Sequence, residues 1–428
     1  MNQYGQLVPR KEYIEAVNKG DANRVKSLLA DKKELREYIN EPWFSFDAPA
    51  IVFAASMVNK PLVDVLLDAG ADIDAKSSWW AGGTSALQQA AGSMLAYNKD
   101  FAEYLINRGA TIEAHAAAGL DMVDTLQELI QSNPDVVNAP GCDGMSPLHF
   151  AATPRIAELL LQHGADINLR DRDHNGTAAQ WTMRRRPEVC KYLLNNGAEG
   201  DAVIYCVIGD VEKAKAEFQK NPELLKLRIN MKAAEGFIIP SENTIRSNSN
   251  GTPEHGVPGG HVYVYQIGPT MPLLEVALQS KQMEIVDLLF DLGYQINLRD
   301  WYVLVGQGPK RFDKLLKDII AKGIDINAIQ KHKREMWAPL HWVAQRGLTD
   351  GIAVLLANGA DPNVITDKGK TPLHFIAQKG VGKNQVELLL KHGANLNIRD
   401  DDGKTPVDYA KKAKRKTVAD FLSNLDLQ

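Results

Sequence analysis

The sequence predicts an all-α fold, a solenoid of helix pairs stacked one on the next. A tetrapeptide of the Thr-Pro-Leu-His type recurs, most clearly at residues 146–149, 338–341 and 371–374. Its proline repeats at a fixed period, since Pro339 lies 33 residues before Pro372. Each copy is followed by a short apolar segment, a Leu-rich segment and a glycine. Signatures that recur in phase predict a repeat architecture rather than one globular core.

The tetrapeptide predicts the start of the first helix in each pair. A Ser or Thr hydroxyl accepts a hydrogen bond from an unpaired backbone N–H of the first turn, and proline fits the next position. Leu-rich runs such as 288–290, 354–356 and 388–390 predict the apolar face of the second helix. A glycine predicts its end, because a helix C-terminus commonly needs a left-handed residue. These glycines are Gly70, Gly109, Gly164, Gly197, Gly293, Gly323, Gly359 and Gly393.

With a period near 33 and both signatures in phase, the chain resembles the ankyrin-repeat family over nearly its whole length. The resemblance implies helix pairs joined by short β-hairpin loops. We expect about twelve pairs, because one pair cannot bury both helix faces and neighbours must stack. They start near residues 10, 47, 84, 114, 145, 176, 200, 270, 302, 337, 370 and 404. At 23–35, 122–137 and 211–225, an Asn-Pro or charged turn replaces the glycine stop.

One segment interrupts the periodicity. It divides the chain into N-terminal repeats 1–230, an insertion 231–269, and C-terminal repeats 270–428 that end in a polar cap. Six of the ten residues in 241–250 are Ser or Asn, and a strand-like segment follows at 261–268. Unstructured connections longer than about 12–15 residues are uncommon in compact domains, and those that occur are often functional. We expect both ends of the insertion to pack on the solenoid. Its middle is interpreted as a binding or catalytic site, a structural lid or a mobile spacer.

Composition narrows the class of protein. There are 53 acidic and 49 basic residues, and the net charge of −4 gives no field suited to wrapping nucleic acid. Three cysteines are too few, and odd in number, for a disulfide framework, which favours a reducing compartment. No segment reaches the roughly 18 apolar residues that a membrane helix requires. We predict a cytoplasmic protein with no membrane or nucleic-acid partner, unless a signal peptide has been trimmed from the chain.

Segments that mimic ligand-binding motifs lack essential residues. Residues 171–176 look like the first half of a calcium loop, but the twelfth position is Thr182, where a bidentate Glu is required. They are predicted to form a turn. Gly369 and Gly403 begin Gly-Lys-Thr runs, yet neither has the glycine that a phosphate loop needs five residues earlier. We predict no metal and no cofactor.

The histidines of interest fall into two groups. One group occupies the repeat's own histidine position, for which the resemblance implies hydrogen bonds to backbone between units: His149, His341 and His374. The other group, His255 and His261, lies in the insertion, where no repeat rule requires histidine. With Glu254 and Tyr263, they are the candidates for acid–base catalysis, although their spacing matches no standard metal pattern.

Tryptophan is concentrated near the segments that join repeats. Trp, Tyr and Arg are the usual anchors of binding sites, and an exposed Trp needs a cover or a partner. We expect hairpin segments to carry Trp43, Trp79, Trp80, Trp301, Tyr302 and Trp337, and first helices to carry Trp181 and Trp342. These residues are predicted to line a partner-binding surface. The alternative is that the hairpin tryptophans pack on one another or under the insertion.

Two functional hypotheses follow. The leading one is a non-catalytic scaffold that recognises a protein partner on its concave face, since no catalytic motif survives inspection. The alternative is an enzyme, or a binder of a carbohydrate or another small polar molecule, with its site in the groove beneath residues 231–269. That site would use His255, His261, Glu254, Arg246 and Tyr263 against the tryptophans.

Overall fold

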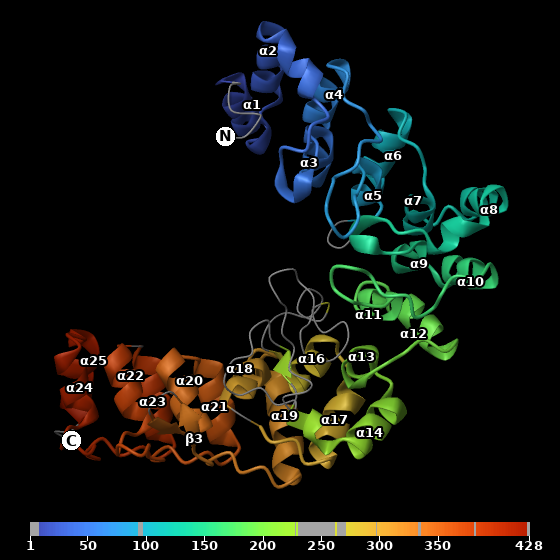
Figure 1. Cartoon of the computed structure of the whole chain (residues 1–428). Coiled ribbons are helices and arrows are strands. Elements are labelled where there is room, and N and C mark those ends of the chain that lie inside the picture. Colours follow the sequence, from blue (N-terminus) through green and yellow to red (C-terminus); the bar gives the residue numbers. More distant parts are fainter. Residues whose placement is uncertain are drawn as a thin grey trace. The chain divides into compact units, whose positions relative to one another are not determined.

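The structure is a computed structural model that describes residues 8–92, 97–226, 228–229, 262, 271–296, 298–332, 335–380 and 382–425. The chain forms two compact units, Met1–Val276 (unit 1) and Ala277–Gln428 (unit 2). Within the described ranges helices dominate, and the strands are two or three residues long. The predicted all-α solenoid is therefore confirmed (Figure 1). The division into repeats 1–230, insertion and repeats 270–428 stays a prediction.

The helices of unit 1 follow one another as first and second members of pairs. The pairs are α1 (Val8–Asn18) and α2 (Ala22–Asp31), α3 (Ala50–Ser56) and α4 (Lys60–Asp68), α5 (Ala86–Ala90) and α6 (Lys99–Asn107), α7 (Ala114–Gly119) and α8 (Val123–Ser132), α9 (Pro147–Phe150) and α10 (Pro154–Gln162), α11 (Ala178–Thr182) and α12 (Pro187–Asn195), and α13 (Ala202–Ile208) and α14 (Val211–Lys220). Strands β1 (Arg228–Ile229) and β2 (Met271–Pro272) pair antiparallel. Helix α16 (Leu273–Gln279) contains the boundary between the units.

Unit 2 continues the same alternation. Its helices are α17 (Met283–Asp291), α18 (Leu298–Val305), α19 (Pro309–Ala321), α20 (Pro339–Arg346), α21 (Thr349–Ala357), α22 (Pro372–Lys379), α23 (Lys383–Lys391), α24 (Pro406–Lys412) and α25 (Lys416–Leu425). Strands β3 (Gln330–His332) and β4 (Glu335–Trp337) form an antiparallel hairpin before α20. In the described residues, no helix is both long and apolar enough to span a bilayer.

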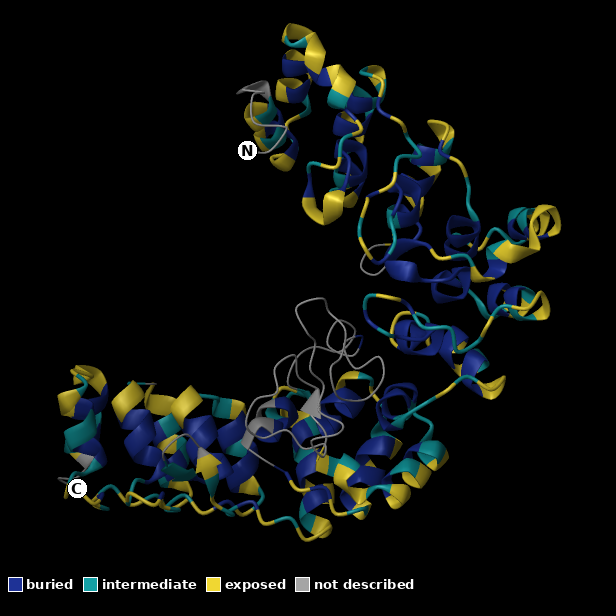
Figure 2. Ribbon diagram, viewed as in Figure 1, coloured by how far each residue is buried: buried dark blue, intermediate teal, exposed yellow. Residues whose placement is uncertain are grey.

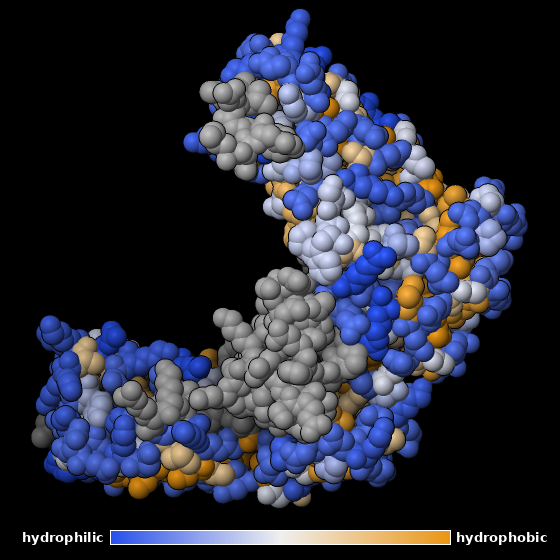
Figure 3. Space-filling model, in the orientation of Figure 1, coloured by the Kyte–Doolittle hydropathy of each residue, from blue (hydrophilic) through white to orange (hydrophobic). Residues whose placement is uncertain are grey.

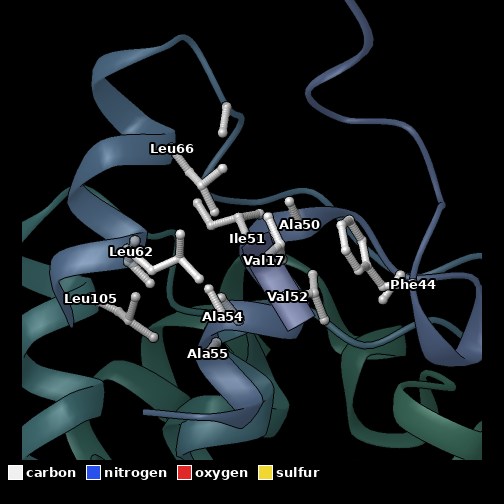
Figure 4. Packing of buried hydrophobic residues seen from close by; sticks show 14 of the residues in the cluster. Val17, Phe44, Ala50, Ile51, Val52, Ala54, Ala55, Leu62, Leu66 and Leu105 are labelled. Carbon is white, nitrogen blue, oxygen red and sulfur yellow. The ribbon is translucent and has the colours of Figure 1, made fainter. Parts of the chain in front are cut away.

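Apolar packing between successive repeats builds the core. First helices pack on first helices, as α3 on α5 and α20 on α22, and second helices on second helices, as α21 on α23. In Figure 4, Ile51 of α3 and Leu62 and Leu66 of α4 point into one cluster. The apolar faces are buried between repeats, while the outer faces are exposed (Figure 2). Each fully buried Leu contributes roughly 1.5–3 kcal/mol, which exceeds the capping terms of about 1 kcal/mol.

The tetrapeptide histidines join one repeat to the next. The Nδ1 atom of His374 accepts a hydrogen bond from the backbone N–H of Thr371, so its Nε2 carries the proton and donates to Lys404 O at 3.1 Å. His341 and His149 do the same, with His149 Nε2 donating to Gly176 O at 3.2 Å. Burial lowers the pKa of His341 to about 4, so its ring is neutral near pH 7. The predicted structural role of these histidines is confirmed.

Second helices end as their sequences predict. Gly359 has a left-handed φ of 91°, and the other seven predicted stops also have positive φ. Where the glycine is absent, a short 3₁₀ helix ends the repeat instead. These are η1 (Lys33–Tyr38), η3 (Pro134–Asn138) and η5 (Pro222–Lys226). The three diverged endings are thus local changes of turn within an unchanged stack.

One local prediction is wrong. Trp301 and Tyr302 lie in helix α18 rather than in a hairpin. Helix α18 begins at Leu298, so the helix starts within the segment expected to form the hairpin. Trp301 and Leu304 are three residues apart and both buried, as the spacing on one helix face requires. The interior position of these apolar residues thus decides in favour of the helix.

Candidate functional site

The residues predicted for a catalytic site in the insertion lie outside the described residues: Arg246, Glu254, His255, His261 and Tyr263. Within 231–269 the structure describes Val262, whose side chain is fully buried. A Cβ atom added to Gly176 would lie 2.3 Å from Val262 Cγ2, so Val262 packs against this glycine. Residue 262 therefore contacts the end of the turn formed by residues 171–176.

Four of the predicted surface tryptophans are interior residues. Trp181, Trp301, Trp337 and Trp342 are all buried. Trp181 Nε1–H donates to Asp171 Oδ2 at 2.8 Å, and the Trp337 ring meets Phe375 edge-on at 4.7 Å between centroids. Trp337 thus packs against the next repeat, and all four rings are buried because a large apolar ring is more stable in the interior than in water. Burial removes Trp301, Trp337 and Trp342 from the predicted binding surface, whereas Trp181, although buried, lies at the wall of a pocket.

The remaining tryptophans lie at unit 1 turns. Trp43 is half-buried, stacked on Tyr38 at 5.9 Å with the Arg10 guanidinium 4.6 Å from its ring centroid. Trp79 and Trp80 are neighbours, with ring centroids 6.1 Å apart, and Trp80 is 51% exposed. These three residues are thus the predicted tryptophans that the structure leaves at least partly accessible.

Phe46 extends this accessible surface. Its side chain is 66% exposed, and its ring meets Trp79 edge-on at 5.2 Å. It has a φ of 62°, a left-handed conformation that is uncommon for a bulky residue. The next residue, Asp47, is also left-handed, and its carbonyl accepts a hydrogen bond from Ser78 N–H at 2.9 Å. We call Phe46, Trp79 and Trp80 the aromatic tip.

The turn at 171–176 is closed by one aspartate. Asp171 Oδ1 accepts from the backbone N–H of His174 at 2.6 Å, and Oδ2 accepts from that of Gly176 at 2.9 Å. Burial alone would raise the pKa of Asp171, but the hydrogen bond with His174 and the charges of neighbouring histidines lower it. The segment is a turn, as predicted. Among the described residues, no His, Cys, Asp and Glu cluster is arranged to hold a metal ion.

A pocket lies along the first helices of unit 1 where α9 is short. Helix α9 has 4 residues and its neighbours α7 and α11 have 6 and 5, whereas α20 and α22, at the same place in their repeats, have 8 each. The cavity beside it has a volume of about 390 Å³. Its inner wall includes His149 and Trp181, which are buried. We call this cavity the α9 pocket.

The α9 pocket combines apolar wall residues, such as Met145 and Ala152, with several polar and charged side chains. Arg186 Nη1 donates to Phe150 O, and also to Ala151 O at 3.3 Å, so it caps the carbonyl end of α9. Arg185 is exposed at the same pocket, and Thr153 Oγ1–H donates to Asp121 Oδ1 at 2.7 Å. In Figure 3, strongly hydrophilic residues gather over the part of unit 1 where α11 and α12 lie. The arrangement can bind an anionic group.

Sequence reasoning missed this pocket. Two signals were present: three consecutive arginines at 184–186, and the short distance from Pro147 to the next helix at Pro154. Neither signal places Arg186 against Phe150 on its own, because the two residues are 36 positions apart.

Comparison with known proteins gives one family. A family model described as ankyrin repeats in three copies matches residues 114–203 and 340–428. Ankyrin repeat and SAM domain-containing protein 6 of Rattus norvegicus is 37% identical over 78 residues, 17% of this chain and 9% of that protein. The protein of the same name in Mus musculus is 36% identical over 78 residues, with the same shares. Ankyrin repeat domain-containing protein 40 of Homo sapiens is 26% identical over 68 residues, 16% of this chain and 18% of that protein. The chain spans less than a fifth of each relative.

Proposed function

We propose, from the premise that this chain is an ankyrin-repeat protein, that it is a non-catalytic scaffold which binds a protein partner through the turns and first helices of unit 1. Ankyrin repeats generally mediate contacts between proteins. The observation that carries the proposal for this chain is the aromatic tip, a group of accessible aromatic side chains on two successive turns.

The aromatic tip has the chemistry of a binding hot spot. Trp and Phe are enriched at protein interfaces, and a few such anchors carry most of the binding energy. Phe46 sits in a sparsely populated backbone conformation, which costs on the order of 1–3 kcal/mol and persists only where the surroundings hold it. Strain at an exposed aromatic residue supports a functional role, because the exposed ring offers little stability in return.

The test is partner capture by wild type and by a Phe46→Asn/Trp80→Ser double variant. Asn accommodates a left-handed backbone, so Phe46→Asn removes the ring without changing the turn. Since a hot-spot residue contributes about 2 kcal/mol or more, we expect captured partner to fall roughly 30-fold or further. Ile365→Ser is the matched control, because Ile365 is 52% exposed in a loop of unit 2. Equal capture by all three proteins would rule the aromatic tip out as the binding surface.

The alternative of an enzyme or small-molecule binder rests on residues of 231–269 that lie outside the described ranges. No observation on the described residues favours it over protein binding. The cytoplasmic assignment likewise stays a prediction, supported by three buried cysteines that are all free thiols.

A further inference from the structure

We propose that the α9 pocket is a receptor for one carboxylate group, the side chain of an aspartate or glutamate in an extended segment of the protein partner. The inference rests on the proposed function in one respect, namely that the carboxylate belongs to a protein. Three observations carry it: a cavity beside a shortened helix, a guanidinium held in place inside that cavity, and a balance of charge that one carboxylate completes.

The short first helices beside the cavity, with α9 the shortest of them, leave the space. A first helix of 8 residues, as in α20 and α22, makes about two turns, while the 4 residues of α9 make about one. The chain then passes directly through Ala152 and Thr153 into α10, and both residues line the cavity. Its volume of about 390 Å³ falls within the usual range for ligand pockets. That is room for a side chain and the backbone on either side of it.

Arg186 is held in place before any ligand binds. Its Nη1 donates to the carbonyls of Phe150 and Ala151 at the end of α9. Its Nη2 lies 2.7 Å from the point where a Cβ atom of Gly92 would be, so the glycine permits this close approach. Because a guanidinium has five N–H donors, the two bonds from Nη1 leave further donors on Nη2 and Nε that a carboxylate can accept from. Preorganisation of this kind reduces the entropy lost on binding.

The charged side chains at the pocket carry one net positive charge, which a single negative group would neutralise. Arg185 and Arg186 are positive, Asp121 is negative, and His149 is neutral because its buried ring has a lowered pKa. Burial also lowers the pKa of Arg186, and the neighbouring charge of Arg185 acts in the same direction. An anion beside the two guanidiniums relieves this repulsion. One carboxylate neutralises the set, whereas a phosphate dianion exceeds it by one charge.

The experiment is a selection of displayed random dodecapeptides on the full chain. We expect Asp or Glu to be enriched at one position on wild type, and the enrichment to disappear on Arg185→Gln. The best acidic peptide is then synthesised with Glu, Gln or phosphoserine at that position. We expect the Gln peptide to bind the wild-type protein at least about tenfold more weakly than the Glu peptide does. The Glu peptide should lose the same factor on the Arg185→Gln protein. The Gln peptide should bind the Arg185→Gln protein little more weakly than it binds wild type. Arg185 is exposed, so this variant keeps its fold, which circular dichroism verifies.

Several results would overturn the proposal. One is a selection that yields no peptides, or only peptides without acidic residues. Another is that Arg185→Gln leaves the affinity for the acidic peptides unchanged. A third is that the phosphoserine peptide binds more tightly than the Glu peptide. Failure of the proposed function gives a different pattern. If the Phe46→Asn/Trp80→Ser variant selects the same acidic peptides and also captures partner as wild type does, the aromatic tip is not the partner-binding surface. The proposal of a carboxylate site in the α9 pocket is then unaffected.

Discussion

Asp143 is a buried carboxyl group in an unusual conformation. It lies in a left-handed turn with a φ of 54°, and only 6% of its surface is exposed. Cys142 Sγ–H donates to its Oδ2 at 3.1 Å, and the backbone N–H of Arg172 donates to its carbonyl at 2.8 Å. Burial raises the pKa of Asp143 to about 6, although Cys142 and the charge of His174 act in the opposite direction. The native protein therefore keeps a proton on Asp143 at pH values where the unfolded chain has lost it.

This difference predicts that stability falls as pH rises. A carboxyl group whose native pKa lies above its unfolded value of 3.8 stabilises the fold fully below pH 3.8, and the contribution is lost as pH rises through about 6. We expect the free energy of unfolding to drop by on the order of 2 kcal/mol from this group between pH 4.5 and 7.5. Asp143→Asn should remove that drop, since Asn fits the left-handed turn and does not titrate. Urea unfolding at a series of pH values measures it.

In the Asp143→Asn variant, the neighbouring titratable groups determine the pH dependence of stability that remains. Burial would lower the pKa of His174, but the hydrogen bond and charge of Asp171 raise it, so its contribution is also lost as pH rises above 6.5. The pKa of Asp171 is lowered, so its contribution is lost only as pH falls below 3.8. The variant should thus retain a weaker decline at the alkaline end of the range. Parallel pH profiles for wild type and Asp143→Asn would show that Asp143 ionises in the native state at its ordinary pKa.

Helices of this chain differ in how far their own sequence determines them. Helix α24 carries its start signal within four residues, because Thr405 accepts from Asp408 N–H and Pro406 occupies the first turn. Helices with such local signals were predictable. Helix α18 has no such Thr-Pro start, and the repeat spacing alone places the tryptophan at position 301 in a hairpin. Burial of its apolar face decides that segment, and burial depends on repeats distant in sequence.

The α9 pocket, like helix α18, depends on contacts between residues distant in sequence, so a local motif does not predict it. A cavity left by a missing helical turn has no motif of its own. Arg186 reaches Phe150 only after the two repeats have stacked. The aromatic tip was predictable in part, because Trp79 and Trp80 fall in a turn by their place in the repeat. The exposure of Phe46 at this tip was not predictable, because its φ of 62° is a property of the folded turn.

Helix α9 should depend on Arg186 for its stability. The guanidinium satisfies the carbonyls of Phe150 and Ala151, which a longer helix would have paired internally. We expect Arg186→Ala to reduce the free energy of unfolding by about 2 kcal/mol, since hydrogen bonds to charged groups contribute roughly 1.5–3 kcal/mol. Arg185→Ala is the matched control, and as an exposed substitution it should change stability by no more than about 0.5 kcal/mol. Equal losses for the two variants would contradict the capping role.

At the scale of the whole molecule, cohesion is local. Many first helices pack on the next first helix, as α7 on α9, and many second helices on the next second helix, as α8 on α10 and α21 on α23. The stability of such a stack is approximately a sum of repeat and neighbour terms. A defect in one repeat should therefore weaken its neighbours in the row more than distant repeats of the same unit.

Hydrogen exchange on two cavity variants tests this, one in each unit. Leu389 of α23 and Leu126 of α8 are both fully buried, and Leu→Ala at such sites costs about 2–5 kcal/mol. In unit 2, we expect Leu389→Ala to speed amide exchange in α21 to α25 and to leave α17 near its wild-type rate. In unit 1, Leu126→Ala should act on α7 to α10 and leave α1 and α2 near theirs. A uniform rise over every helix of the unit would mean that the unit unfolds as one cooperative body. Neighbour-by-neighbour stacking would then be the wrong account of its stability.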